Sequence, residues 1–217
     1  MIRLDTLPAP QRAVWEEDLH GLPPGFVLYG GTAIALHLGH RQSVDFDFFS
    51  SAALDRTALR RACPLIAVAK TLQDEPDTLT VVAERGGAPV KLSFFGGIDF
   101  GRVGEPLRVQ NRPPVASRID LLGTKLATVT QRIEARDYVD IAALLGSGLT
   151  LNEGVAALLA LYGNQASGLQ SVKTIAWFKD GDLEVLLPRD VRDTLVRAAA
   201  SYDPHTGPAS KRSARLD

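Results

Sequence analysis

The chain has 217 residues, of which 45% are hydrophobic and 23% charged, and its formal net charge is −1 at pH 7. These values are typical of a globular protein with one sizeable core or two small ones, and they argue against strong non-specific binding of nucleic acid over the whole surface. The single cysteine, Cys63, excludes an internal disulfide, and no apolar run is long enough to cross a membrane. Because the N-terminus also lacks a signal-peptide pattern, we expect a cytoplasmic protein.

The first predicted elements alternate between helix and strand. They are expected at residues 11–20 (helix), 26–29 (strand), 32–38 (helix) and 44–49 (strand). Gly39 suits the C-terminal end of the second helix. Acidic residues alternate with aromatic or aliphatic ones over 44–49, which predicts a half-buried strand.

A third helix and further strands follow. We predict the helix at residues 53–62, where Pro64 would stop it, and strands at 65–69, 79–83, 90–95 and 106–110. The Gly86-Gly87 pair predicts a hairpin between the strands at 79–83 and 90–95.

Beyond Pro113-Pro114 the pattern becomes helical. Apolar residues recur at helical spacing at Ile119, Leu122, Leu126 and Val129, and again around Val139 and Leu144. Residues 151–162 and 188–200 predict two more helices. The sequence therefore predicts an α/β N-terminal half and a helical C-terminal half divided near residue 112, with a poorly ordered tail from Asp203.

One segment of the N-terminal half carries most of the chemical information. Gly30, Gly31 and Thr32 form a turn that opens a helix, and Asp45 and Asp47 stand two residues apart on the strand that follows. Side chains two apart on a strand point to the same face. Backbone N–H groups at a helix start bind phosphate, and paired carboxylates are hard oxygen ligands for magnesium. An isolated Asp-x-Asp would more often be plain strand surface, but with the glycine turn upstream it predicts a site for a nucleoside triphosphate and its metal.

The neighbouring residues have both structural and functional interpretations. Glycines at positions 30 and 31 would let the backbone approach a phosphate, and the Thr32 hydroxyl would cap the helix or donate to the phosphate. Arg41 is either a phosphate contact or a solvated surface charge, and Ser43 is a loop-stabilising hydroxyl or a part of the site. Phe46 and Phe48 are expected to anchor the opposite face of the strand in the core.

This turn, helix, loop and strand resemble the signature of the DNA polymerase beta-like nucleotidyltransferase superfamily. The resemblance is closer to the abortive-infection nucleotidyltransferase toxins (AbiEii-like). The matching residues are Gly30, Gly31, Thr32, Ala33, Ile34, Arg41, Ser43, Asp45, Asp47, Phe48 and Phe49. It resumes at Lys125-Leu126-Ala127 and Arg136-Asp137-Tyr138-Val139-Asp140, so it spans roughly residues 25 to 145.

The resemblance implies an α+β fold in which a small mixed twisted sheet with flanking helices is followed by a helical half. It divides the chain into a nucleotidyltransferase core (1–112), a helical half closing the active site (113–202) and a tail (203–217). It also implies Mg²⁺ (or Mn²⁺) as cofactor, a nucleoside triphosphate as substrate, an RNA acceptor, expected to be tRNA, and a toxin with a separately encoded antitoxin. Catalytic roles would fall to Asp45 and Asp47 as metal ligands.

Lys125 and Asp137 enter the predicted site through the resemblance. Taken alone, Lys125 is a lysine whose stem covers the edge of the core, and Asp137 and Asp140 are acids favoured in the first turn of a helix. The resemblance implies that Lys125 contacts the triphosphate and that an aspartate of the second block is catalytic, for which we choose Asp137.

The sequence departs from the superfamily at one place. Members often carry a third carboxylate on a later strand, and on the predicted strand 90–95 Ser93 stands there, on one face with Lys91 and Phe95. Asp99, Glu84 or Asp137 would have to substitute. This departure keeps open the alternative of a catalytically silent nucleotide-binding or RNA-binding module. Transfer to a small molecule or a protein, which relatives of this fold carry out, is a second alternative.

A basic stretch is compatible with an RNA acceptor. Residues 102–136 contain seven basic residues, against Glu105, Asp120 and Glu134; the basic ones are Arg102, Arg108, Arg112, Arg118, Lys125, Arg132 and Arg136. They form either a face for an RNA backbone or ordinary solvated helix surface.

Overall fold

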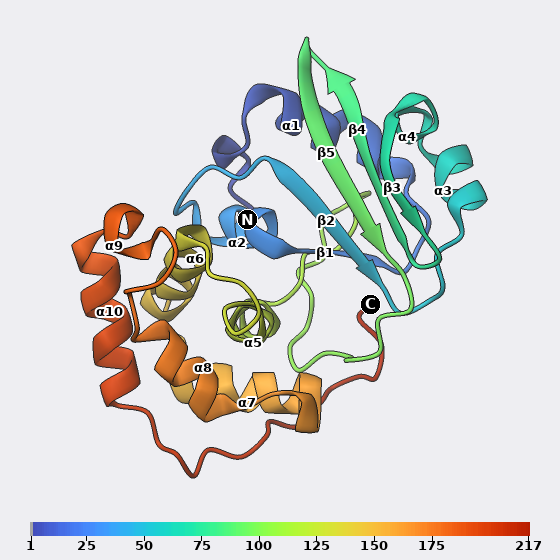
Figure 1. Cartoon of the computed structure of the whole chain (residues 1–217). Coiled ribbons are helices and arrows are strands. Elements are labelled where there is room, and N and C mark those ends of the chain that lie inside the picture. The colour runs from blue at the N-terminus through green and yellow to red at the C-terminus, as the bar shows by residue number, and fades with distance from the viewer. Residues whose placement is uncertain (1) are drawn as a thin grey trace. The chain divides into compact units, whose positions relative to one another are not determined.

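The structure, a computed structural model, describes residues 2–217 and divides into two compact units (Figure 1). The sheet unit consists of the chain up to Gly101, together with Glu105–Ser117 and Ser213–Asp217. The helical unit consists of Arg102–Gly104 and Arg118–Arg212. The domain division made from the sequence, at residues 112 and 202, stays a prediction about which parts form separate domains.

The sheet unit is built on five strands in a mixed sheet, which confirms the predicted fold class. Its strands are β1 (Phe26–Tyr29), β2 (Asp45–Ser50), β3 (Lys70–Glu75), β4 (Thr78–Arg85) and β5 (Ala88–Phe95). They lie in the order β1-β2-β5-β4-β3. β2 and β5 pair in parallel, whereas the other neighbouring pairs are antiparallel.

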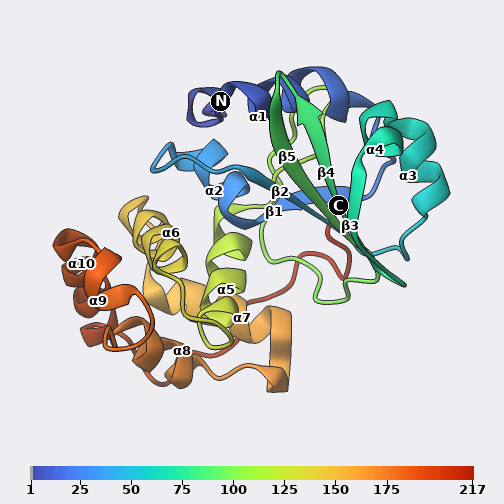
Figure 2. The ribbon, with the colours of Figure 1, turned by 45° about the horizontal axis from the view of Figure 1, so that its top comes forward.

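Helices and helical turns complete this unit. They are η1 (Leu4–Thr6), α1 (Ala9–Ala13), η2 (Val14–Asp18), η3 (Leu19–Gly21), α2 (Gly30–Leu38), α3 (Arg56–Ala62) and α4 (Pro64–Val68). α1 packs against β4 and β5, and α4 packs against β4 (Figure 2). As expected, Gly39 ends α2, with a φ of +68° and its N–H donated to the carbonyl of Ala35.

The predicted strand at residues 65–69 is wrong, because this segment forms the helix α4. Pro64 stands at the first position of that helix, where its missing N–H costs nothing. Ile66, a residue of the same helix, is buried. The strand lies further on, as β3 (Lys70–Glu75), which the sequence did not predict. Every residue of β3 is exposed, so it has no apolar alternation, and its pairing with β4 alone makes it a strand.

The predicted strand at residues 106–110 is also wrong. Only one isolated bridge forms there, between Leu107 and Val115. Pro106 begins this segment and Pro113-Pro114 lie just beyond it, so three residues lack the N–H donors that a longer ladder needs.

Aromatic side chains fill one face of the sheet. Trp15 stacks on Phe46 with ring centroids 6.2 Å apart, Phe46 on Phe48 at 6.1 Å, and Phe48 on Phe94 at 5.2 Å. All four are fully buried, and burying a phenylalanine contributes about 1.5–3 kcal/mol. This row confirms that Phe46 and Phe48 anchor β2, and it leaves the other face of the strand to the acidic residues.

The helical unit contains α5 (Arg118–Thr128), α6 (Ala135–Gly146), α7 (Leu151–Tyr162), η4 (Gly163–Gln165), α8 (Gly168–Ile175), α9 (Leu183–Leu186) and α10 (Arg189–Ala200). α8 and α9 were not predicted. α5 and α7 cross closely because Gly154 has no side chain: a Cβ there would lie 2.6 Å from Leu122 Cδ2. Asp120, buried near the start of α5, accepts the N–H of Val103 at 2.7 Å and so ties the 102–104 segment to this unit.

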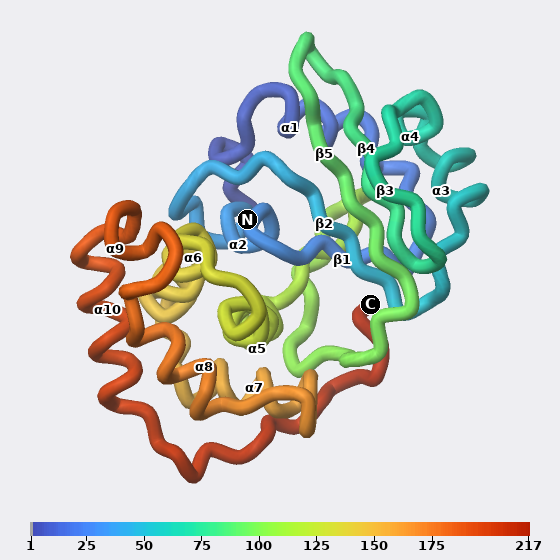
Figure 3. Tube along the Cα trace, viewed as in Figure 1, coloured from blue at the N-terminus to red at the C-terminus, as the bar shows by residue number. Residues whose placement is uncertain are grey.

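Residues 203–217 contain no helix and run along the units (Figure 3). The Ala209 N–H donates to the carbonyl of Ala156 at 2.8 Å within the helical unit. Leu216 is buried in the sheet unit, where its N–H donates to Ser51 Oγ at 3.1 Å. The predicted lack of order in this tail stays a prediction.

Within residues 2–217, no single helix has the length and apolar character needed to span a membrane. In the same range, α6 and the segment Leu151–Gln165 have that length and apolar character only when taken together, and the chain bends by 117° between them.

A capping box fixes the N-terminus of α7. Thr150 Oγ1 accepts the Glu153 N–H at 3.2 Å, and Glu153 Oε2 accepts the Thr150 N–H at 2.7 Å. The Thr150 N–H and, after it, the Thr150 hydroxyl, which donates to Glu153 Oε2 at 2.8 Å, hold the pKa of Glu153 below its usual value.

We expect Thr150→Ala to lower the free energy of unfolding by about 1 kcal/mol at pH 7, because α7 loses a capping acceptor. Thr206→Ala, in the tail, is the control and should change it by less than about 0.5 kcal/mol. Urea unfolding followed by circular dichroism measures both.

The capping box also predicts a pH dependence. Since the folded pKa of Glu153 is lowered, the stability that its carboxylate contributes is present above the unfolded pKa and is lost as pH falls through the folded pKa. Wild type should therefore lose its advantage over Glu153→Gln in acid; an equal effect of the two threonine substitutions, or a pH-independent gap, would contradict the capping box.

Candidate active site

The glycine turn brings the start of α2 against the acidic strand. Gly30 has a φ of +72°, in the left-handed region that favours glycine. A Cβ at this position would lie 2.6 Å from Asp47 Oδ2. A Cβ at Gly31 would overlap the guanidinium of Arg41. Glycine is thus favoured at Gly30 by its backbone conformation, whereas at Gly31 a side chain would require the flexible Arg41 guanidinium to move.

Asp45 and Asp47 lie on the face of β2 opposite the aromatic row. Both are partly exposed, whereas Phe46 and Phe48 between and after them are fully buried. Asp47 Oδ2 faces the first residue of α2, where the helix dipole places positive potential. The two carboxylates therefore share one face of β2 within the sheet unit, and Asp47 lies beside the helix start; their role as metal ligands stays a prediction.

The parallel pairing of β2 with β5 adds a lysine to this face. Asp45 is paired with Lys91 and Asp47 with Ser93. Lys91 Nζ lies 2.9 Å from Asp45 Oδ2. The sequence had placed Lys91 on the face of Ser93, but only the strand order shows that its partner is Asp45.

The acidic face offers a divalent cation two carboxylates. Ser93 is buried beside Asp47, and no group of three or more His, Cys, Asp or Glu side chains within residues 2–217 is arranged to hold a metal. Neither Glu84 nor Asp99 therefore joins the two aspartates. Two carboxylates still fit Mg²⁺, which usually keeps several waters and takes further ligands from phosphate oxygens.

Two hydroxyl groups lock the turn to the acidic strand. The Thr32 hydroxyl donates to the backbone carbonyl of Asp45, and its oxygen lies 2.8 Å from Ser43 Oγ. Because the hydrogen of Thr32 is used on that carbonyl, Ser43 must be the donor in the second bond. Both side chains are buried, so their observed contacts position α2 and β2 relative to each other. Their predicted contacts with a nucleotide stay predictions.

Arg41 lies beside the turn. Its guanidinium approaches Gly31, and its Nη1 donates to the carbonyl of Gln42 at 2.9 Å. This arrangement places a cation next to the N-terminus of α2, which is where a bound phosphate would need one.

A second ionic cluster lies in the helical unit. Lys125 Nζ of α5 is 2.6 Å from Asp137 Oδ1 and 2.7 Å from Asp140 Oδ2 of α6. Arg132 Nε is 3.1 Å from Asp137 Oδ2. Both carboxylates are fully buried and Lys125 is nearly so. Two cations thus balance two anions, and the cluster joins α5 to α6; the catalytic roles of Lys125 and Asp137 stay predictions.

Most of the basic stretch is used in internal bonds. Arg112 Nε donates to the carbonyl of Trp15 at 2.7 Å, Arg136 pairs with Glu134, and Lys125 and Arg132 belong to the cluster above. These seven residues also divide between the two units, so they do not form one surface of either.

Known proteins share this sequence pattern and this fold. The sequence profile of the family described as "Nucleotidyl transferase AbiEii toxin, Type IV TA system" matches residues 14–206. An uncharacterized protein of Aquifex aeolicus (strain VF5) is 27% identical over 169 residues, which cover 76% of this chain and 79% of the relative.

Two solved structures have a similar fold at low sequence identity. JHP933 from Helicobacter pylori is 19% identical, with 88% of this chain and 86% of that chain covered and a TM-score of 0.53. MenT4, a nucleotidyltransferase toxin from Mycobacterium tuberculosis, is 14% identical, with 82% and 76% covered and a TM-score of 0.51.

We expect Lys91→Ala to tighten binding of Mn²⁺ about tenfold, because the lysine ammonium and the metal compete for Asp45. Electron paramagnetic resonance of free Mn²⁺ during titration measures this without any turnover. Lys70→Ala, an exposed lysine on β3 of the same sheet, is the control and should leave the affinity unchanged. Equal affinities in wild type and Lys91→Ala would show that the ion pair does not oppose the metal.

We expect Lys125→Ala to lower the free energy of unfolding by about 3–5 kcal/mol, because it leaves two buried carboxylates without their shared cation. Lys179→Ala removes an exposed lysine paired with Glu184 and should cost less than about 1 kcal/mol. Adding Asp140→Asn to Lys125→Ala should recover part of the loss. If the two lysine substitutions had similar effects in urea unfolding, the cluster would not be the link between α5 and α6.

Proposed function

Because the chain belongs to the AbiEii family of nucleotidyl transferase toxins of type IV toxin–antitoxin systems, we propose that it transfers a nucleoside monophosphate to RNA, with tRNA as the expected acceptor. Membership of this family implies a nucleotidyltransferase that uses a nucleoside triphosphate and a divalent metal, and an antitoxin partner. The choice of magnesium and the RNA acceptor are the parts that belong to our proposal.

The observation that carries the proposal is the meeting of Asp45, Asp47 and the glycine turn. Asp47 Oδ2 lies where a side chain at Gly30 would otherwise stand. The proximity of this carboxylate to the N–H groups of a helix start supports the proposal, because a metal-bound triphosphate requires metal ligands beside phosphate-binding groups.

In this proposal Asp45 and Asp47 hold Mg²⁺ or Mn²⁺, and the backbone of Gly30 and Gly31 cradles the phosphates. A bound metal supplies positive charge that offsets the charge of the triphosphate during transfer. Arg41 adds a cation beside the same turn. Thr32 and Ser43 keep the turn and the strand in place, since their hydroxyls bond to each other and that of Thr32 also donates to the backbone carbonyl of Asp45.

The reaction forms one phosphorus–oxygen bond and breaks another. The oxygen of an acceptor hydroxyl attacks the α-phosphorus, and the hydroxyl proton passes to solvent water. The bond from that phosphorus to the oxygen bridging the α- and β-phosphates breaks, and pyrophosphate leaves with the electron pair. The chain's contribution is to position the phosphates and to offset their charge.

Lys125 and Asp137 are included in the proposed catalytic set on the strength of the family motif. Their tight mutual pairing supports α5 and α6, so a loss of activity on substitution needs a stability measurement beside it. A variant that stays folded and loses transfer supports a catalytic role.

The test uses α-labelled nucleoside triphosphates, Mg²⁺ and total tRNA. We expect label to enter RNA, and Asp45→Asn or Asp47→Asn to reduce its entry by about 100-fold, because each removes a charged metal ligand. Asp99→Asn, an exposed acid outside the site, should retain wild-type transfer and serves as the control.

Other outcomes of this assay decide against parts of the proposal. Label in the protein or in an added small molecule would replace RNA as the acceptor. Binding of the nucleotide without transfer to any acceptor would overturn the proposed activity. Full transfer by an Asp45→Asn, Asp47→Asn double variant would overturn the metal assignment.

A further inference from the structure

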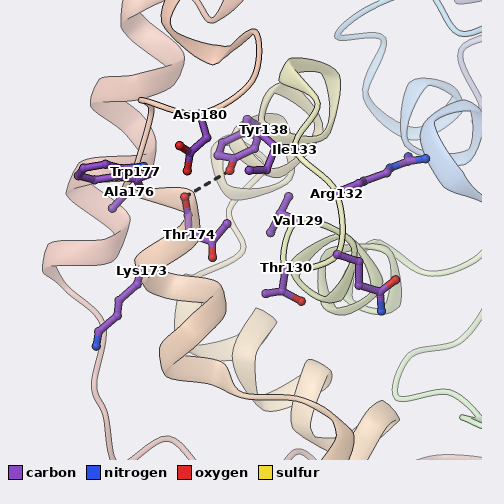
Figure 4. A pocket seen from close by; sticks show the side chains of 11 residues that line it. Val129, Thr130, Arg132, Ile133, Tyr138, Lys173, Thr174, Ala176, Trp177 and Asp180 are labelled. Atoms are coloured by element: carbon purple, nitrogen blue, oxygen red, sulfur yellow. Dashed lines mark hydrogen bonds between the residues drawn. The ribbon is translucent and has the colours of Figure 1, made fainter.

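The helical unit contains an open pocket of about 650 Å³ that the proposed reaction does not use (Figure 4). It lies between the segment 129–133, which follows α5, and the segment 173–180, at the end of α8 and beyond, with Tyr138 of α6 between them. Its volume falls in the range of small-molecule sites. All of its lining residues belong to the one unit.

Apolar and aromatic groups form most of the lining. Val129, Ile133 and Ala176 contribute aliphatic surface, and Tyr138 and Trp177 contribute rings. Trp177 is 56% exposed and Ile133 is 39% exposed. A large, rigid ring left open to solvent beside a cavity is a platform for a flat partner.

Asp180 is the one acidic side chain in the lining, which also contains hydroxyl groups and the amide of Gln131. The Tyr138 hydroxyl donates to the carbonyl of Thr174 at 3.3 Å, and the Thr130 hydroxyl donates to the carbonyl of Ala127 at 2.7 Å. Burial and the charges of Asp180 and Asp137 raise the pKa of Tyr138 to about 12, so this hydroxyl keeps its proton. Figure 4 shows the Asp180 carboxylate pointing toward Tyr138 and Thr174. A ligand with N–H donors would pair with that carboxylate.

Cationic side chains stand at two edges of the pocket: Lys173 at one and, at the other, Arg132, which also pairs with Asp137 and Glu134. In Figure 4 the side chains of Lys173 and Arg132 extend away from the cavity in different directions. An acceptor inside and cations at the edges complement a molecule that has N–H donors on a flat ring and negative charge on both sides of it. A base within an RNA strand has this pattern, because a phosphate precedes it and another follows it.

We propose that this pocket receives one unstacked base of single-stranded RNA, packed against Trp177. Guanine fits best among the four bases, because its ring N–H and amino group present two donors side by side to the Asp180 carboxylate. The neighbouring phosphates lie toward Lys173 and Arg132. This inference rests on RNA being the acceptor of the proposed reaction, and it states how part of that RNA is held.

Trp177 itself reports binding. The chain has two tryptophans, and Trp15 is buried, so quenching of Trp177 fluorescence can be separated from the rest. The titrations use the full chain carrying Asp45→Asn and Asp47→Asn, without metal or triphosphate, so that no transfer occurs. The probes are the four nucleoside monophosphates and short single-stranded RNAs with or without one guanine, and excitation is at the red edge of tryptophan absorption, where nucleotides do not absorb.

We expect saturable quenching that is strongest with the guanine-containing RNA. Asp180→Asn should weaken its binding about tenfold and reduce the preference for guanine, because one acceptor becomes a donor. Trp177→Ala should weaken binding about tenfold when it is followed by anisotropy of a labelled RNA. Leu169→Ala, on the exposed side of α8 and outside the pocket, is the control and should bind as the parent does.

The inference is overturned if no nucleotide or RNA quenches Trp177 saturably while acrylamide does. It is also overturned if Trp177→Ala and Asp180→Asn bind RNA as tightly as Leu169→Ala does. Binding of indole in the pocket without binding of nucleotides would overturn it too, and would indicate an apolar protein side chain as the occupant. The transfer assay separates this result from the proposed function: transfer to RNA without pocket binding refutes only the pocket. Pocket binding without transfer refutes only the reaction.

Discussion

Alternation along β2 is the constraint on which the site depends. Because Phe46 and Phe48 are buried in a row of aromatic rings with Trp15 and Phe94, their neighbours Asp45 and Asp47 must face the other way. A register shift of one residue would bury both carboxylates and expose both rings, at a cost of several kcal/mol. The packing of the core therefore fixes the direction of the acids, and the Thr32 hydroxyl fixes their distance from the helix start by binding the Asp45 carbonyl.

Each unit holds a lysine against aspartates, but the two pairs differ in their physics. Lys91 and Asp45 are partly exposed, so water screens their attraction and a cation can compete for the carboxylate. Lys125 lies with Asp137 and Asp140 in the interior, where charges without partners are costly and the three must stay together. The first arrangement suits a site that exchanges ligands, and the second suits a joint between helices.

The elements were predictable where the pattern of apolar residues is strong. The helix at 151–162 lies at its predicted position because burial imposes a helical period on its side chains, and the strands at 26–29 and 90–95 lie at or close to theirs because their apolar runs are mostly buried. The edge strand β3 has no such period, since both of its faces are exposed, and the segment after Pro64 is too short for its apolar run to distinguish a helix from a strand. Leu107 has strand-like neighbours but forms only one bridge, because proline interrupts the ladder.

The sequence by itself determined the motif: a glycine turn, two acids on one strand face, and the aromatic residues that orient them. Local spacing suffices for this, because side chains two apart on a strand share a face in any fold. Only the tertiary structure decided that β5 lies beside β2 and puts Lys91 on Asp45, that the Thr32 hydroxyl is bonded to the acidic strand, and that Lys125 is enclosed by two buried carboxylates. These contacts join segments distant in the chain, and their formation depends on strand order and helix packing, which no local pattern encodes.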